Sequence, residues 1–224
     1  PNGPVLLLRK PRKEARSVDE LVAAGVIDEA LAKRLVAAVA SNRSIAVVGP
    51  RGSGRRTIVN ALGLLIEDAE RLVVAEAGVR MSLPQPHVIR IDTSLYEQVE
   101  PLTIALSMRP DRLLHCAERP GELIDLIAAA MGGLPPWIAS FYADSGDDLI
   151  GRAQRAMLLD QPGQSAEVVR ECVGATFDVV VSCKRLPGGG FKVDFVERVL
   201  DALGQLELPA LTDADLTASP ADSD

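Results

Sequence analysis

The fold is decided by one stretch of the chain, Ser44-Ile-Ala-Val-Val-Gly-Pro-Arg-Gly-Ser-Gly-Arg-Arg-Thr57. Residues 44–48 are uncharged and rich in β-branched side chains, which favours a strand buried on both faces of a parallel sheet. A glycine-rich segment follows, and apolar residues then recur at helical spacing over residues 58–66. A strand, a glycine-rich turn and a helix in this order are typical of a loop whose backbone amides surround a phosphate group.

The glycine-rich segment matches the phosphate-loop pattern G-x-x-x-x-G-K-S/T at its glycines but not at its two chemical positions. Gly49 and Gly54 have the correct spacing, Arg55 replaces the Lys, and Arg56 replaces the hydroxyl residue that would ligate Mg²⁺. The planar guanidinium of Arg keeps the charge but is larger than an ammonium group. Candidate phosphate contacts are Gly49, Arg51, Gly52, Ser53, Gly54, Arg55, Arg56 and Thr57.

Two interpretations of this loop stay open: a nucleotide or phosphate site without efficient turnover, or a glycine-rich turn with a basic surface. ATP or ADP is the ligand we consider for the first. Mg²⁺ is kept open, although Arg56 places a cation near its expected position, and we assign no metal ligands.

Short apolar segments alternate with helical segments along the rest of the chain. Strands are expected at residues 72–75, 88–91, 112–116 and 138–141, and helices at residues 122–131, 148–159 and 166–175. This alternation predicts an α/β fold with a mostly parallel sheet flanked by helices. Residues 177–184 and 191–196 flank Leu186-Pro-Gly-Gly-Gly190 and predict a C-terminal antiparallel hairpin at the sheet margin.

The N-terminal part contains two signals for the start of a helix. Ser17 and Glu20 have capping-box spacing, and Asp28 can cap a longer helix. We expect residues 1–16, with a short strand at residues 5–8, to be a linker from a preceding domain. Residues 17–205 would form the main domain and residues 206–224 an acidic, disordered tail.

Composition excludes several classes of protein. The 224 residues carry a net charge of −7 and only four Phe, two Tyr and one Trp, which argues against a nucleic-acid-binding protein. Cys116, Cys172 and Cys183 are widely spaced, so neither a disulfide framework nor a zinc site is indicated. We see no transmembrane segment. A cytoplasmic location is expected, with a peripheral position at the inner membrane as an alternative.

Three segments outside the loop carry a more specific pattern. They are Pro84-Gln-Pro-His-Val-Ile-Arg-Ile-Asp92, Ser107-Met-Arg-Pro-Asp-Arg-Leu-Leu114 and Arg119-Pro-Gly-Glu122. They resemble Q-P-H-V-V-R-L-E, R-M-R-P-D-R-I-I and R-G-G-E of the type II/type IV secretion ATPase family, specifically the branch that assembles tight-adherence (Tad) pili. The resemblance implies a RecA-like P-loop NTPase core that works in rings with nucleotide at the subunit boundaries.

The positions that carry chemistry in this family differ here. Glu76 is kept but Ala77 replaces an Asp, Ala117 stands where the family has its water-activating Glu, and Tyr142 stands at a family histidine position. Glu118 lies one residue beyond Ala117 and would point to the opposite face unless the strand has ended.

The resemblance therefore implies a degenerate ATPase domain that acts as a structural or regulatory subunit of a secretion or pilus motor. Its partners would be inner-membrane platform proteins and an active paralogous ATPase, in a homo- or hetero-oligomer. One alternative is an active ATPase with a non-standard loop that uses Glu76 or Glu118. Another is an anion-sensing module outside secretion.

Four arginines are candidates for phosphate contacts across subunit boundaries: Arg90, Arg109, Arg112 and Arg119. The competing interpretation is that they form salt bridges with Asp92, Asp111 and Glu122. His115 is expected to be a core residue rather than a ligand, and Trp137 is expected to pack in the interior.

Overall fold

The computed structural model describes residues 16–78, 81–95, 101–119, 121–160 and 163–198. The expected strand at residues 5–8 and the expected tail at residues 206–224 lie outside these ranges. Nothing in the described part tests the proposed linker or the end of the main domain.

Within the described residues, seven strands form one sheet in the order β3-β2-β4-β5-β1-β6-β7. The strands are β1 (Ile45–Val48), β2 (Leu72–Glu76), β3 (Val88–Asp92), β4 (Arg112–Cys116), β5 (Trp137–Phe141), β6 (Val179–Arg185) and β7 (Phe191–Arg198). All neighbouring pairs are parallel except β6 and β7, which form an antiparallel hairpin with an irregularity between Ser182 and Cys183. The mostly parallel sheet and its C-terminal hairpin are both confirmed.

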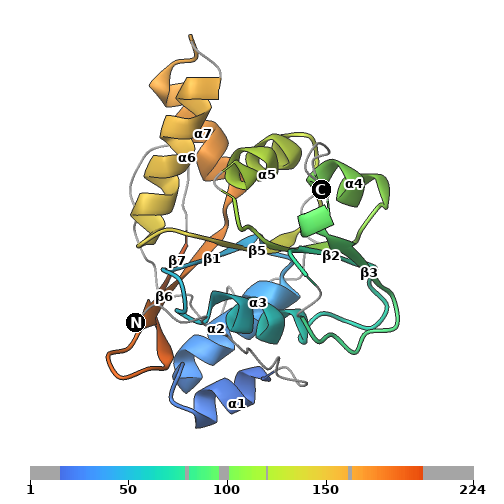
Figure 1. Cartoon of the computed structure of the whole chain (residues 1–224), viewed down its shortest axis with the longest axis vertical. Coiled ribbons are helices and arrows are strands. Elements are labelled where there is room, and N and C mark those ends of the chain that lie inside the picture. Colours follow the sequence, from blue (N-terminus) through green and yellow to red (C-terminus); the bar gives the residue numbers. More distant parts are fainter. Residues whose placement is uncertain (1–15, 79–80, 96–100, 120, 161–162, 199–224) are drawn as a thin grey trace, which may run out of the picture.

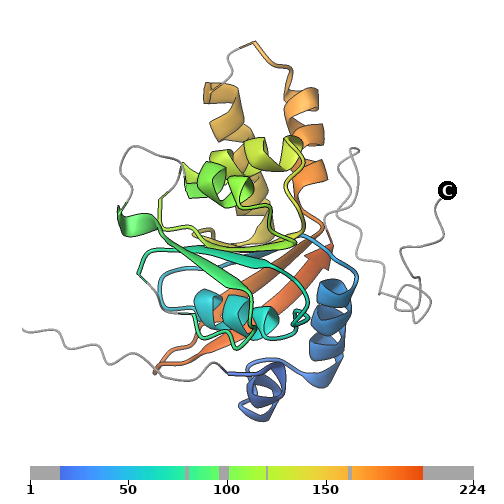
Figure 2. The same ribbon diagram turned by 90° about the vertical axis from the view of Figure 1, so that its right-hand side faces the viewer.

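Helices cover both faces of the sheet (Figures 1 and 2). One face carries α1 (Val18–Ala23), α2 (Glu29–Ala40) and α3 (Arg55–Gly63); the other carries α4 (Pro101–Ser107), α5 (Glu122–Met131), α6 (Gly146–Asp160) and α7 (Ala166–Thr176). A short 3-10 helix, η1 (Thr93–Leu95), follows β3. β1 is apolar throughout because both of its faces are covered. Ile45 and Val47 pack in the layer with α3, and Ala46 and Val48 pack in the layer under α4–α7.

The helix starts confirm the capping signals. The side chain of Ser17 accepts a hydrogen bond from the amide of Glu20, whose carboxylate accepts one from the amide of Ser17. The carboxylate of Asp28 accepts a hydrogen bond from the amide of Leu31. Trp137 is fully buried in the layer under α4–α7 and meets Phe177 edge-to-face at 5.5 Å, so its expected packing role is also confirmed.

One helix was not predicted. α4 has seven residues and starts at Pro101, a residue type suited to the first turn of a helix. Seven residues give less than two full turns of apolar periodicity, so the pattern alone does not separate such a helix from a loop.

Candidate functional site

The candidate site lies at the carboxyl edge of the parallel strands. β1, β2, β4 and β5 run in the same direction, so the segments that follow them meet at one edge. These segments carry the glycine-rich loop after β1, Glu76 at the end of β2, Glu118 after β4 and Tyr142 after β5. Ligands of open α/β sheets bind at this edge.

The glycines of the loop are required by close approaches. A Cβ atom on Gly49 would lie 2.4 Å from the carbonyl oxygen of Cys183, and one on Gly54 would lie 2.1 Å from Cδ2 of Phe191. Gly54 also has a φ of +83°, in the left-handed region that favours glycine. The loop is therefore pressed against the β6–β7 hairpin, with the Phe191 ring against the start of α3.

The start of α3 offers hydrogen-bond donors to an anion. The amide of Ile58 donates to the carbonyl of Gly54 at 3.0 Å and closes the first turn, which leaves the amides of residues 55–57 without partners inside the helix. The hydroxyl of Ser53 is buried and has no hydrogen-bond partner among the described residues. Orphan donors and a positive helix end together suit a phosphate group.

Arg55, at the family Lys position, packs on an aromatic ring. Its guanidinium carbon lies 3.6 Å from the centroid of the Tyr142 ring, and that of Arg51 lies 5.1 Å from the same centroid. Burial lowers the pKa of Arg55, and the neighbouring Tyr142 partly offsets this. Because an Arg pKa starts far above neutral, Arg55 stays charged, and Tyr142 supports the cation through a cation–π contact.

Arg56, at the family hydroxyl position, forms an ion pair instead. Its Nη2 donates to Oε1 of Glu118 at 2.7 Å, and the hydroxyl of Tyr142 donates to Oε2 of Glu118 at 3.0 Å. Nε of Arg56 also lies 3.8 Å from Oε2 of Glu76. Burial acts to lower the pKa of Arg56, but Cys116, Glu118 and Glu76 outweigh it and raise the pKa. We call Arg56, Glu118 and Tyr142 the inner network.

Glu118 reaches the loop because the strand has ended. β4 stops at Cys116, and Ala117 packs into the core layer under α4–α7. The amide of Glu118 is held by a hydrogen bond to the carboxylate of Glu122 at 3.1 Å. The rule of alternating faces therefore does not apply to Glu118, whose carboxylate lies on the loop side.

Glu76, the other candidate carboxylate, is buried at the end of β2. Its Oε1 accepts a hydrogen bond from the amide of Met81 at 2.9 Å and lies 3.9 Å from Nη1 of Arg90. Of the four arginines proposed for contacts between subunits, Arg90 is the one that lies next to a carboxylate of the site.

The other three arginines make local contacts. Arg112 is buried, with Nε donating to Glu70 at 2.7 Å and Nη2 donating to the carbonyl of Val39 at 2.9 Å and to the side chain of Asn42. Arg119 donates to Glu122 at 2.8 Å. Arg109 has a φ of +49°, and its carbonyl accepts from Arg71. The burial of Arg112 keeps it from a neighbouring subunit.

His115 lies in the core, as expected. Its Nδ1 lies 3.1 Å from the carbonyl of Ala75, and its Nε2 lies 3.2 Å from Oε2 of Glu122, without the alignment of a hydrogen bond. Burial acts to raise the pKa of Glu122, but contacts with His115 and Arg119 outweigh it and lower the pKa. This buried pair supports the turn that carries Glu118.

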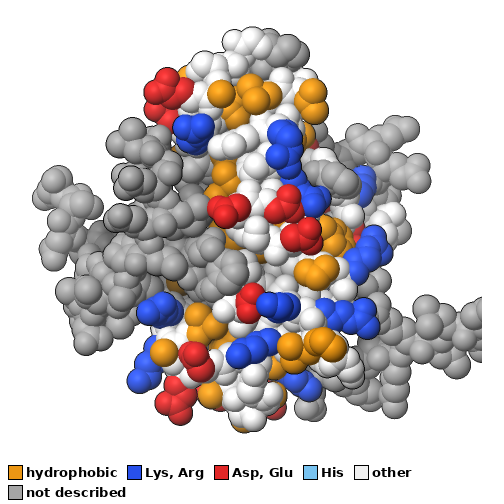
Figure 3. Space-filling model, turned by 90° about the vertical axis from the view of Figure 1, so that its left-hand side faces the viewer, with side chains coloured by type: hydrophobic (Ala, Val, Ile, Leu, Met, Phe, Trp, Pro, Cys, Tyr) orange, Lys and Arg blue, Asp and Glu red, His pale blue; other side chains and the backbone are white. Residues whose placement is uncertain are grey.

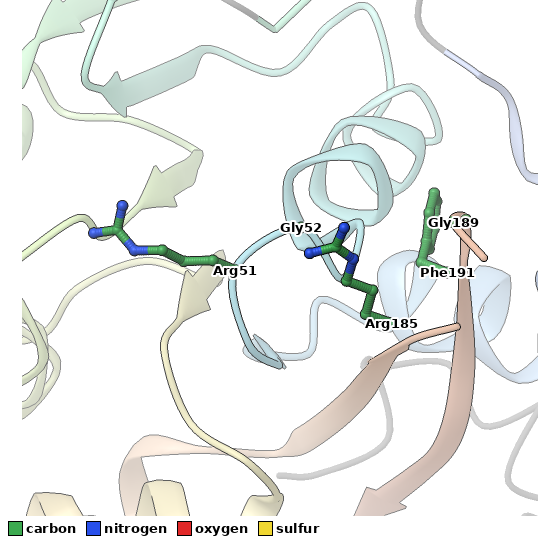
Figure 4. Close-up of a pocket in the computed structure, with 6 residues that line it drawn as sticks. Arg51, Gly52, Arg185, Gly189 and Phe191 are labelled. Carbon is green, nitrogen blue, oxygen red and sulfur yellow. The ribbon is translucent and has the colours of Figure 1, made fainter. Parts of the chain in front are cut away.

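An open pocket of about 440 Å³ lies on the outer side of the loop. It is lined by Arg51, Gly52, Arg185, Gly189, Gly190 and Phe191. Figure 4 shows the side chain of Arg185 extending toward Gly52, while Arg51 extends away on the other side of the loop. We call this the outer pocket.

Arg185 and Phe191 were missed as site residues. The signal available in the sequence was the run Gly188-Gly-Gly190, which lets a hairpin turn come close to other backbone between a cation and an aromatic residue. On the side of the molecule that carries this hairpin, Lys and Arg side chains gather below α6 and α7 (Figure 3). The outer pocket itself is lined by two cationic residues, Arg51 and Arg185.

Two features are absent from the part of the chain that the structure describes. No group of three or more His, Cys, Asp or Glu side chains in this part of the chain could hold a metal ion. Among the helices formed by these residues, none is both long and apolar enough to cross a membrane.

The fold and the loop between β1 and α3 define the RecA-like class of P-loop NTPases. A crystal structure of the VirB11 ATPase from the Brucella suis type IV secretion system, in complex with sulphate, superposes with a TM-score of 0.65 at 26% identity, over 85% of this chain and 65% of that one. The pilus retraction motor PilT with bound ADP superposes with a TM-score of 0.64 at 16% identity, over 83% of this chain and 54% of PilT, which shows the fold alone.

The family model described as type II/IV secretion system protein matches residues 1–164, and the chain belongs to this family. The type IV secretion system protein PtlH of Bordetella pertussis is 30% identical over 77% of this chain and 53% of its own length. The conjugal transfer protein TrbB of Rhizobium radiobacter is 24% identical over 82% of this chain and 57% of its own length. The chain thus spans little more than half the length of these relatives.

Proposed function

We propose that this chain binds a nucleotide or phosphate without efficient turnover and serves as a structural or regulatory subunit of a secretion or pilus-assembly motor. The observation that carries the proposal is the inner network. Glu118 is the carboxylate placed nearest to the family's water-activating position, and both of its oxygens are engaged, one by Arg56 and one by Tyr142. A carboxylate held in this way is a poor proton acceptor for water.

Binding of a nucleotide or phosphate is supported by groups that remain although Arg55, Arg56 and Ala117 replace the family's usual residues. The loop itself offers the amides of residues 55–57 and the buried hydroxyl of Ser53 as hydrogen-bond donors. Two cationic residues, Arg51 and Arg185, line the outer pocket beside it. The VirB11 structure contains sulphate and the PilT structure contains ADP, and we propose that this chain also binds an anion. ATP or ADP is the ligand that we propose.

Poor turnover follows from the missing groups. Loss of a general base costs roughly 10² to 10⁴ in rate. Phosphoryl transfer also depends on the loop Lys and the bound metal, which stabilise the charge of the transition state. Replacement of the Lys by Arg55 and of the hydroxyl residue by Arg56 removes this second contribution to the rate. Such losses are not additive, yet together they bring hydrolysis close to the uncatalysed rate.

The second candidate function is an active ATPase that uses Glu118. It is favoured by one observation, the end of β4 at Cys116, which frees Glu118 to face the loop. In this case Arg56 would have to release Glu118 when nucleotide binds. Glu76 is the weaker candidate, because Oε1 accepts from a backbone amide and the side chain is buried.

The finer assignment to the Tad branch is also a proposal. It is supported by the segments at residues 84–92, 107–114 and 119–122, which follow the pattern of that branch. We propose a cytoplasmic protein that joins a homo- or hetero-oligomer with inner-membrane platform proteins and an active paralogous ATPase. Arg90, Arg109 and Arg119, whose residues are exposed, are the arginines that we keep as candidates for contacts across a subunit boundary.

Steady-state hydrolysis of ATP by the purified chain separates the two functions. If the chain binds nucleotide without efficient turnover, we expect no release of phosphate above the background of a Gly54→Ala control. Turnover that is abolished by Glu118→Gln would establish the active ATPase instead. As a test of binding, the double variant Arg55→Lys, Arg56→Thr should bind Mg·ADP more tightly than the wild type, and no gain would count against a phosphate site in this loop.

A further inference from the structure

The side chain at the expected metal position has no atom that can bind a metal. In phosphate loops this position holds a hydroxyl that ligates Mg²⁺. Here it holds Arg56, whose guanidinium has five N–H donors and no acceptor. The hydroxyl of Thr57 lies one residue further along α3 and therefore projects from a different side of the helix. The loop therefore lacks the first protein ligand that Mg²⁺ requires.

The nearby carboxylates are also engaged by groups other than a metal. Arg56 lies 2.7 Å from Oε1 of Glu118 and 3.8 Å from Oε2 of Glu76. The second oxygen of Glu118 accepts from Tyr142, and Oε1 of Glu76 accepts from Met81. A divalent cation placed here would meet the charge of Arg56 and would have to displace it. The residues present do not fit Mg²⁺.

The loop nevertheless keeps a strongly cationic character. Arg51, Arg55 and Arg56 lie within the loop, and Arg185 approaches Gly52 from the hairpin, with its Nη1 3.7 Å from where a Cβ of Gly52 would be. A nucleotide without bound Mg²⁺ carries more negative charge than its magnesium complex. Fixed guanidinium groups suit such an anion because they can donate paired hydrogen bonds to phosphate oxygens.

We propose that Arg56 is a built-in cation in place of Mg²⁺, so that this site takes nucleoside di- or triphosphates as the metal-free anion. This inference rests on the proposed function that the loop holds a phosphate chain. It adds the chemical form of the ligand and the residue that selects it. Glu118 pairs with the guanidinium of Arg56 and competes with the nucleotide for it.

The direct test is a titration of the purified chain with a fluorescent ADP analogue, once in EDTA and once in excess Mg²⁺. We expect affinity in EDTA to be equal to or tighter than that in Mg²⁺. Binding that requires Mg²⁺ would overturn this inference and leave the proposed function standing. Absence of binding in both buffers would overturn the proposed function together with the inference.

Variants locate the effect at Arg56. Arg56→Thr restores the hydroxyl and should make binding prefer Mg²⁺ by about fivefold or more, within the usual range for coupled ligands. Arg170→Thr, on the exposed surface of α7, is the matched control and should bind as the wild type does in both buffers. If Arg56→Thr folds and shows no gain from Mg²⁺, Arg56 does not select the metal-free form. Arg56→Lys, which keeps the charge, should remain independent of Mg²⁺ and provides a second variant.

Discussion

The two sides of the glycine-rich loop differ in how their arginines are used. On the inner side, Arg56 is paired with Glu118 and Arg55 lies on Tyr142. On the outer side, Arg185 points at the loop, and the described residues include no salt bridge to it. Positive charge near a phosphate loop therefore does not by itself indicate a catalytic site. Arg185 on the outer side has no carboxylate partner among the described residues, whereas Arg56 on the inner side is held by Glu118.

The largest effect on nucleotide binding and stability should come from Gly54, where the glycine-rich loop contacts the β6–β7 hairpin. Gly54→Ala places a Cβ against the Phe191 ring and forces a side chain into a left-handed conformation. We expect loss of nucleotide binding and a decrease of about 1–3 kcal/mol in the free energy of unfolding. Urea denaturation and the ADP titration measure the two effects.

Gly188→Ala is the matched control for this prediction. Gly188 has a φ of +86°, but no atom lies within 4 Å of where its Cβ would be. The loss of stability in Gly188→Ala therefore measures only the cost of placing a side chain on a left-handed backbone. The double variant Gly54→Ala, Phe191→Ala should recover part of the lost stability. Equal losses in the two glycine variants would show that the contact between loop and hairpin is not important.

The next effect concerns the outer pocket. Arg185→Ala removes a cation that lines it, and we expect nucleotide affinity to fall about tenfold, as for the loss of a hydrogen bond to a charged group. Thermal stability should hardly change because the side chain is on the surface. Lys184→Ala, next to it and 63% exposed, is the control and should leave affinity near the wild-type value. If both variants weaken binding equally, the outer pocket contributes only general positive charge.

A smaller effect is expected from breaking the inner network. Glu118→Gln removes the charge that pairs with Arg56, both groups being partly exposed, and should cost about 1 kcal/mol of stability after allowance for screening by solvent. ADP should bind somewhat more tightly, because a negative charge near the phosphates is gone and Arg56 is released. Calorimetry gives the stability and the ADP titration gives the affinity. Weaker binding in Glu118→Gln would contradict a network that competes with the ligand.

The smallest effect is the pH dependence that comes from Glu122, which holds the turn of Glu118. Because the folded pKa of Glu122 lies below the ordinary value of 4.5, its stabilising contribution is complete above that pH and is lost as the pH falls through the folded pKa. The difference in Tm between wild type and Glu122→Gln should therefore be constant near neutral pH and shrink below pH 4.5. A difference that does not change on acidification would show that Glu122 acts only through packing.

Local patterns explain how much could be predicted from the sequence. β1 and the loop were predictable because an apolar strand and spaced glycines lie within a few residues of each other. The hairpin was predictable because Gly188-Gly-Gly190 separates two apolar runs. Such signals need no knowledge of tertiary contacts.

The parts that could not be predicted depend on distant residues. Arg56 and Glu118 are 62 positions apart, and their pairing depends on β4 ending at Cys116 rather than one residue later. Arg112 pairs with Glu70 and not with its neighbour Asp111, because the fold buries it beside the end of α2. Ion pairs of this kind are fixed by topology and register, which the spacing of residues does not give.

The fate of ATP held by the protein tests the central claim most directly. The chain is mixed with an equal amount of ATP, the complex is separated from free nucleotide, and the ratio of ATP to ADP in the complex is followed with time. We predict that nucleotide is retained and that it stays ATP for as long as free ATP does in the same buffer. Conversion of the retained ATP to ADP, abolished in Glu118→Gln, would contradict it.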